Sequence, residues 1–272
     1  MPIERIDSAD DPRLADYRHL PDPELLRRGE IFIAEGRLVV RTLLGRSLFA
    51  TRSVLVTENA REALWDVLEA RIDQLPVFVV SEATIETVTG FDIHRGCLAI
   101  GVRPPRQSVF GLLDKLPVAR RLVVLEQIAN ADNLGGIFRN AAAFGADGVV
   151  LGPGCCDPLY RKAIRVSMGA ALQVPFCHAD QWEPDLEAIR SRGVLLAALT
   201  TSSDSLEIGR WATALAEASR LALLAGSEGV GLTDGALAHA DVRLRIPMAP
   251  GVDSLNVATA TGIALHACFA RP

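Results

Sequence analysis

Apolar runs alternate with helical stretches over the first hundred residues. Strand-like runs occupy residues 31–36, 53–57, 76–80 and 97–102. Helical stretches occupy residues 37–44, 59–72 and 82–90. The helical stretches repeat apolar side chains at spacings of three and four, whereas the strand-like runs are short and rich in β-branched residues. The pattern predicts a small α/β domain that ends near Val102.

Longer apolar runs follow in the second half of the chain. They occupy residues 121–126, 148–152, 194–200, 221–226 and 242–247. Each run is almost continuously apolar, and helical stretches separate them, which is typical of a parallel sheet covered on both faces. Three prolines within residues 103–117 indicate a boundary between the two halves. We therefore expect an amino-terminal domain over residues 1–105, a linker over 106–119 and a second α/β domain over 120–272.

Polar or glycine-rich loops follow three of the predicted strands. They cover residues 127–136, 226–231 and 247–256. In open parallel sheets, ligands bind outside the carboxyl ends of the strands. We expect these loops and the helices they open to converge, and to bring together Asn133, Arg139, Glu228, Ser254 and Asn256.

Local roles are also expected for these polar side chains. Asn133 precedes the predicted helix and could act as its N-cap. Arg139 has apolar or small neighbours in the sequence, so it should need a partner or a ligand, and Glu228 is the simplest partner. Asp253 or Ser254 could cap the last helix, which leaves Asn256 without a local task.

Several other chemistries find little support in the chain. The glycine-rich loop at 226–231 lacks the Lys-Ser/Thr of a phosphate-binding loop and the glycine spacing of a dinucleotide fingerprint. His94, His178, His239 and His266 stand alone, and no Ser-His-Asp order makes chemical sense. A site with polar side chains and no nucleophile suits transfer between two bound substrates.

The five cysteines are odd in number and irregularly spaced, so a disulfide framework is not expected. A metal site could be assembled from Cys155, Cys156, Cys177 and His178. Adjacent ligands fit poorly around one tetrahedral ion, so we expect buried thiols and no metal.

The composition is that of an ordinary globular protein of 272 residues, 49% of them hydrophobic. The longest apolar runs are far shorter than the roughly 20 residues that a membrane span needs. The acidic, polar first residues do not fit a secretory leader, so we expect a cytoplasmic protein with no membrane association. The net charge of −5 indicates no overall attraction to nucleic acid.

Taken together, residues 130–145, 223–232 and 246–265 resemble the three sequence motifs of the SpoU/TrmH branch of the SPOUT RNA methyltransferases. They read NADNLGGIFRNAAAFG, LLAGSEGVGL and IPMAPGVDSLNVATATGIAL. The amino-terminal segments FIAEG and HRGCLAIGV look like the ribosomal-protein-like RNA-recognition domain that often precedes the catalytic domain in this family.

This resemblance implies a methyl transfer from S-adenosyl-L-methionine to a ribose 2'-hydroxyl of RNA, without a metal. It also implies an α/β domain with a parallel sheet and a carboxyl-terminal trefoil knot. The family pattern places the cofactor against Thr200, Gly226, Ile246, Met248 and Leu255. It places Asn133, Arg139, Glu228, Ser254 and Asn256 around the transferred methyl group and the ribose.

The resemblance further implies a homodimer. The small-residue face of the last helix, Ala258, Thr261, Gly262, Leu265 and Ala267, suits close packing between chains or within an ordinary core. The additional amino-terminal domain favours ribosomal RNA over transfer RNA as the substrate.

The arginine of the first motif needs a physical interpretation. Removing the proton of an arginine at neutral pH costs about 8 kcal/mol, so we expect a charged Arg139 that holds a phosphate or a nascent alkoxide. Two other functions stay open on the residues alone. One is an NAD-dependent oxidoreductase on a similar sheet, and the other is an RNA-binding module without catalysis.

Overall fold

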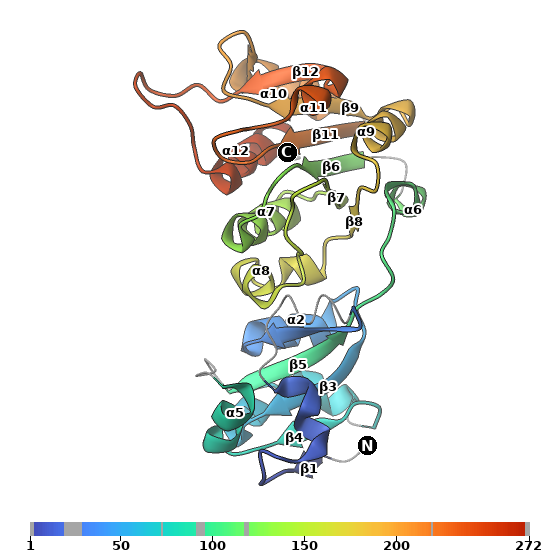
Figure 1. Ribbon diagram of the computed structural model, residues 1–272, viewed down its shortest axis with the longest axis vertical. Coiled ribbons are helices and arrows are strands. Elements are labelled where there is room, and N and C mark those ends of the chain that lie inside the picture. Colours follow the sequence, from blue (N-terminus) through green and yellow to red (C-terminus); the bar gives the residue numbers. More distant parts are fainter. Residues whose placement is uncertain are drawn as a thin grey trace. The chain divides into compact units, whose positions relative to one another are not determined.

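The computed structural model describes residues 3–18, 29–71, 73–90, 96–116, 120–218 and 220–269. The chain forms two compact units, each built on its own sheet (Figure 1). The first unit comprises Met1–Pro105 and Leu159–Gln173, and the second comprises Arg106–Pro158 and Val174–Pro272.

The first unit contains a mixed five-stranded sheet in the order β1-β4-β3-β5-β2. Its strands are β1 (Ile3–Arg5), β2 (Ile31–Glu35), β3 (Thr51–Val56), β4 (Val77–Val79) and β5 (Cys97–Val102). Strand β3 pairs in parallel with β4 and antiparallel with β5. The sequence predicts four of these strands, and β1 has only three residues.

Short helices surround this sheet. They are η1 (Pro12–Tyr17), α2 (Arg37–Gly45), α3 (Glu58–Ala63), α4 (Trp65–Leu68), η2 (Glu69–Arg71), α5 (Glu82–Thr89), α8 (Arg161–Val166) and η3 (Ala170–Leu172). The single helix expected over 59–72 is wrong, because the backbone leaves the helical region at Leu64, with φ −110° and ψ 3°. Leu64 is fully buried there.

The second unit contains a seven-stranded, wholly parallel sheet in the order β10-β12-β9-β11-β6-β7-β8. Its strands are β6 (Arg120–Leu125), β7 (Gly148–Leu151), β8 (Phe176–His178), β9 (Leu195–Leu199), β10 (Leu206–Glu207), β11 (Arg220–Ala225) and β12 (Val242–Arg245). The predicted parallel-sheet α/β fold is therefore confirmed, with all five predicted strands present.

Helices cover both faces of this sheet (Figure 1). They are α6 (Val109–Lys115), α7 (Ala131–Ala143), α9 (Trp182–Ser191), α10 (Ile208–Glu217), α11 (Asp234–His239) and α12 (Val257–Phe269). Helices α6, α9 and α11 share one apolar core with alternate residues of the strands. Helix α12 packs against α7 and α10. Within the described ranges, no helix combines the length and the apolar character needed to cross a membrane.

Two boundaries differ from the sequence prediction. The stretch expected as a linker, 106–119, contains helix α6, whose side chains Val109, Leu112 and Leu113 are buried in the core of the second unit. Pro104 and Pro105 precede this packed helix rather than a flexible linker. The second difference is the segment Leu159–Gln173, which lies within the predicted second domain but folds with the first unit.

Close packing of α12 on α7 positions the beginning of the last helix. A Cβ atom at Gly136 would lie 2.9 Å from the Cβ of Ala258, so the two helices meet at small residues. The side chain of Asn140 donates a hydrogen bond to the carbonyl of Ala258 at 2.8 Å, and Gly262 faces the same asparagine. These small residues therefore serve packing within one chain, and they fix the start of α12 beside α7.

Candidate functional site

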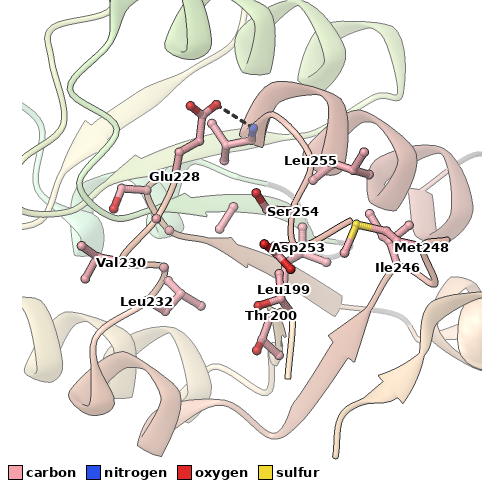
Figure 2. Close-up of a pocket in the computed structure, with 18 of the residues that line it drawn as sticks. Leu199, Thr200, Glu228, Val230, Leu232, Ile246, Met248, Asp253, Ser254 and Leu255 are labelled. Carbon is pink, nitrogen blue, oxygen red and sulfur yellow. Dashed lines mark hydrogen bonds between the residues drawn. The ribbon is translucent and has the colours of Figure 1, made fainter. Parts of the chain in front are cut away.

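A cavity of about 430 Å³ opens at the carboxyl ends of β9, β11 and β12. Its volume lies within the usual range for pockets that bind small molecules. The walls come from the segments that follow these three strands and from the start of α12. In Figure 2, Ile246 and Met248 lie across the cavity from Val230 and Leu232. The position agrees with the rule that ligands bind outside the carboxyl ends of parallel strands.

All five residues expected to contact a cofactor line this cavity. They are Thr200, Gly226, Ile246, Met248 and Leu255. Sequence reasoning missed several apolar lining residues, namely Leu199, Leu232, Leu237 and Val257. For Leu199 the available signal was its place at the end of β9, and for Val257 its place at the start of α12. The apolar walls suit a flat, weakly polar ring.

The charged side chains on the cavity wall are acidic. Glu228 and Asp253 both line it, and no Lys, Arg or His of the described residues does so. Such a lining favours a cationic ligand over an anionic one, because like charges without intervening partners repel. Ser254 lies beside Asp253, is exposed, and also lines the cavity.

Glu228, Asn133 and Asn256 form one hydrogen-bonded group, here called the amide–carboxylate cluster. The Oε1 atom of Glu228 accepts from Asn256 Nδ2 at 2.7 Å and from Asn133 Nδ2 at 3.1 Å. It also accepts from the backbone N–H of Val257 at 3.1 Å, the bond drawn in Figure 2. Asn256 Nδ2 additionally donates to Asn133 Oδ1 at 2.8 Å. The cluster thus joins the three predicted loop regions at a single point.

Asn256 also has the local task that the sequence assigned to its neighbours. Its Oδ1 accepts from the backbone N–H groups of Ala258 at 3.0 Å and Thr259 at 3.2 Å. Asn256 is therefore the side chain that caps α12, and the expected cap at Asp253 or Ser254 is wrong. The helix starts later than a cap at Asp253 or Ser254 would place it, because residues 251–256 have no regular secondary structure.

The expected cap of α7 is also displaced. Asn130 occupies the N-cap position and accepts from the N–H of Asp132 at 2.8 Å. Asn133 lies in the first turn of the helix instead, and its side chain is free to reach the cluster. A negative group at this helix start is favourable, because the unpaired N–H groups give it a partial positive charge.

Arg139 differs most from the sequence prediction. It is exposed, and neither Glu228 nor any other described residue forms an ion pair or hydrogen bond with its side chain. The carboxylate of Glu228 is already held by the two asparagines and the start of α12. Arg139 is thus a charged side chain available to a ligand, and it does not line the cavity.

Glu126 is a buried carboxylate that sequence reasoning missed. Its side chain is fully buried and accepts from the N–H of Thr233 at 2.9 Å and from its hydroxyl at 2.8 Å. Its own N–H donates to the carbonyl of Ala225 at 3.0 Å. Glu126 therefore forms hydrogen bonds at both ends of the loop 226–232, which lines the cavity. The signal in the sequence was an acidic residue at the end of the apolar run 121–126.

Gly226 provides a direct test of how tightly this loop is built. A Cβ atom there would lie 2.3 Å from the carbonyl carbon of Gly231 and 2.5 Å from the nitrogen of Leu232. Backbone atoms cannot move aside without shifting the wall, so we expect Gly226→Ala to lower the free energy of unfolding by about 1 to 3 kcal/mol. Chemical denaturation measures this change.

The matched control is Gly209→Ala, because a Cβ at Gly209 would meet no atom within 4 Å. Equal stability of Gly226→Ala and the wild type would contradict the close approach of Gly226 to Gly231.

The cysteines considered above as metal ligands, Cys155, Cys156 and Cys177, are buried or half-buried. Burial raises the pKa of Cys155 to about 11, and that of Cys156 and of Cys177 to about 12. These groups are therefore thiols rather than thiolates at neutral pH. In the part of the chain that the structure describes, no three His, Cys, Asp or Glu side chains are arranged to hold a metal ion.

Known proteins resemble this chain over most of its length. Residues 120–266 match the model of the SpoU rRNA Methylase family. An uncharacterized tRNA/rRNA methyltransferase of Mycobacterium tuberculosis strain H37Rv is 41% identical, over 98% of this chain and 91% of that protein. The 23S rRNA (guanosine(2553)-2'-O)-methyltransferase RlmP of Bacillus subtilis strain 168 is 25% identical, over 97% and 98%. The structure of an AdoMet-bound rRNA methyltransferase from Sinorhizobium meliloti has a TM-score of 0.79 at 27% identity, over 98% and 97%.

Proposed function

The chain belongs to the SpoU rRNA methylase family, as its three motifs predict, and on that premise we propose that it transfers the methyl group of S-adenosyl-L-methionine to a ribose 2'-hydroxyl of RNA. The observation that carries the proposal is the acidic, apolar-walled cavity at the strand ends, joined to the amide–carboxylate cluster through Glu228. The similarity to RlmP supports the 2'-hydroxyl as the acceptor.

The cavity fits S-adenosyl-L-methionine better than a nicotinamide dinucleotide. When bound, this cofactor supplies a methyl group activated by a sulfonium cation. Glu228 and Asp253 line the cavity without a basic neighbour among the described lining residues, which favours that cation. The diphosphate of NAD would instead need basic side chains or free helix N–H groups. At the start of α12, Glu228 and Asn256 already accept hydrogen bonds from the N–H groups of Val257, Ala258 and Thr259.

We assign the cofactor to the apolar wall. Ile246, Met248 and Leu255 supply contact surface for its adenine, and Gly226 lets the backbone approach closely. Thr200 is held at the end of β9, where its Oγ1 accepts from the N–H of Ser202 at 3.0 Å. These assignments follow from location and from the family resemblance.

We assign the ribose to the polar side chains at the cavity rim. Ser254 is exposed on the cavity wall and offers its hydroxyl to a ribose oxygen. Asn133 and Asn256 hold the Glu228 carboxylate in place, so the polar rim is fixed before substrate binds. Arg139, exposed and unpaired within the described chain, holds a phosphate or the developing alkoxide as a charged group. The hydroxyl proton then leaves to solvent or to a phosphate oxygen.

Calorimetry tests the ligand part of this proposal. The purified protein should bind S-adenosyl-L-methionine and give no measurable heat with NAD, because of the acidic cavity wall. The reverse result would favour the oxidoreductase alternative. Binding of the methyl donor without methyl transfer to any RNA would favour a non-catalytic RNA-binding module.

We further propose that residues 1–105 form an RNA-binding domain and that the substrate is ribosomal rather than transfer RNA. The segment 246–256 links β12 to α12, which packs back on α7. This return path supports the trefoil knot that the resemblance implies. Five free cysteines suit a reducing compartment, and we propose a cytoplasmic location.

A homodimer is part of the same proposal. The small residues Ala258 and Gly262 contact α7 of their own chain, but Thr259, Ile263 and His266 remain exposed along the outer side of α12. Light scattering should therefore give twice the chain mass of 29.2 kDa. A mass of one chain at micromolar concentration would contradict the dimer.

A further inference from the structure

Glu126 is a fully buried carboxylate to which the proposed methyl transfer assigns no role. It directly follows β6 and does not line the cavity. A buried charge is costly unless it is hydrogen-bonded, so its hydrogen-bond partners indicate its role. One carboxylate oxygen accepts from the hydroxyl of Thr233 at 2.8 Å, and the other accepts from the backbone N–H of Thr233 at 2.9 Å. The charge is thus directed at the first residue after the loop 226–232.

The backbone of Glu126 is held by the sheet. Leu125 of β6 and Ala225 of β11 are paired in parallel register. The N–H of Glu126 donates to the carbonyl of Ala225 at 3.0 Å, which extends this pairing by one residue. Glu126 therefore contacts the residue on each side of the loop, Ala225 through its backbone and Thr233 through its side chain.

The two arms of the loop 226–232 are in contact with each other. The N–H of Gly231 donates to the carbonyl of Ser227 at 3.0 Å. A Cβ atom at Gly226 would lie 2.3 Å from the carbonyl carbon of Gly231. Because the arms are joined in this way, a shift of Thr233 would displace the whole loop. Every residue of the loop lines the cavity, so the displacement would change the shape of the cavity wall.

Glu228 lies in the same loop but has separate supports. Its carboxylate accepts from Asn133, from Asn256 and from the backbone N–H of Val257. These donors belong to α7 and to the start of α12, and they do not depend on Glu126. Loss of the contact between Glu126 and Thr233 should therefore loosen the cavity wall while the amide–carboxylate cluster stays in place.

We propose that Glu126 is a positioning residue that sets the affinity for the cofactor, because it holds the loop 226–232 in its binding conformation through Thr233. The inference rests on the proposed function, since it requires that S-adenosyl-L-methionine occupies the cavity. If only a fraction of the molecules holds the loop in place, the apparent dissociation constant rises by the reciprocal of that fraction. Glu126 thus acts on cofactor binding and not on the transfer step.

The main test variant is Glu126→Gln, which keeps the size of the side chain and removes its charge. Glutamine has one acceptor oxygen where glutamate has two, so one of the two hydrogen bonds from Thr233 is lost or reversed. Loss of one charge-assisted hydrogen bond should weaken the binding of S-adenosyl-L-methionine about tenfold, as measured by calorimetry on the full chain. The single-turnover rate at saturating cofactor should stay near the wild-type value, because the donors to Glu228 are unchanged.

The matched control is Asp185→Asn. Asp185 is a buried carboxylate of the same unit, and it accepts from the N–H groups of Asp180 at 2.8 Å and Gln181 at 3.0 Å. None of these three residues lines the cavity. Asp185→Asn should lower the melting temperature, as Glu126→Gln should, but leave the affinity for the cofactor unchanged. The comparison separates a general loss of stability from an effect on the loop.

Two variants of Thr233 test the same contact from its other side, and they give an answer even if Glu126→Gln does not fold. Thr233→Ser keeps the hydroxyl group and should bind the cofactor like the wild type. Thr233→Val removes the hydroxyl group at nearly constant size and should weaken binding as Glu126→Gln does.

Wild-type affinity for the cofactor in both Glu126→Gln and Thr233→Val would overturn the inference, and so would an equal loss of affinity in Asp185→Asn. In either case the proposed function stands if the wild type binds S-adenosyl-L-methionine and methylates RNA. A wild type that does not bind this cofactor would overturn both.

Discussion

Replacement of Arg139 by alanine should lower the rate constant of methyl transfer by about 100- to 1,000-fold, the usual loss when one charged or polar group at a reacting oxygen is removed. The affinity for S-adenosyl-L-methionine should not change, because Arg139 does not line the cavity. Stability should not change either, because the side chain is exposed and has no partner among the described residues. Single-turnover kinetics and calorimetry separate these quantities.

The conservative variant Arg139→Lys decides how the arginine acts. A guanidinium binds two oxygens at once, whereas an ammonium acts as a point charge. A near-normal rate in Arg139→Lys would argue for charge alone and against a forked contact. The control is Arg210→Ala, since Arg210 is an exposed arginine of the same unit with a side chain 81% exposed. A wild-type rate in Arg139→Ala would remove Arg139 from the proposed mechanism.

Replacement of Asn256 by alanine should affect both stability and rate. Loss of the α12 cap lowers the free energy of unfolding by about 1 kcal/mol. Loss of the Nδ2 contacts to Glu228 and Asn133 releases the cluster, and misplacement of a positioned group costs about 100-fold in rate. Denaturation and single-turnover methylation measure the two effects.

Asn256→Ser separates the cap from the cluster. The serine hydroxyl can still cap the helix, but it is too short to bridge Glu228 and Asn133. We therefore expect near-normal stability together with the slow rate of Asn256→Ala. If both variants transfer methyl groups at the wild-type rate, Asn256 serves only to start α12.

Much of the fold can be read from the sequence where burial dominates. Strands β6, β9 and β11 lie in the interior of a sheet covered on both faces, so their apolar runs are continuous and easily recognised. Strands β8 and β10 have three and two residues, too few for a pattern to appear. The segment 159–173 is apolar enough to be buried, but its pattern does not indicate which of two cores it joins.

The sequence predicts where the candidate site lies better than it predicts what each of its residues does. Parallel strands place their carboxyl ends at one edge, which is enough to bring the three loop regions together. The role of each side chain depends on which face of its helix it occupies. Arg139 follows Ile137 and Phe138 in the sequence, but on a helix it shares its face with residues three and four away, such as Ala142 and Ala143, which are exposed.

The first residue of a helix is equally hard to predict from the sequence. Several residues near the beginning of α12 and of α7 can act as caps, and the sequence does not fix which one does. The true caps are Asn256 and Asn130, which changes the tasks left for Ser254 and Asn133. Glu126 acts through distant Thr233, so no local pattern could identify its role.

The most direct test of the central claim is a nucleoside analysis of methylated RNA. The purified protein is incubated with methyl-labelled S-adenosyl-L-methionine and ribosomal RNA from cells that lack the gene, and the RNA is then digested for mass spectrometry. We predict label in a 2'-O-methylated nucleoside, at a position that is methylated in cells with the gene. Label on a base, or no label in any RNA of those cells, would contradict the account.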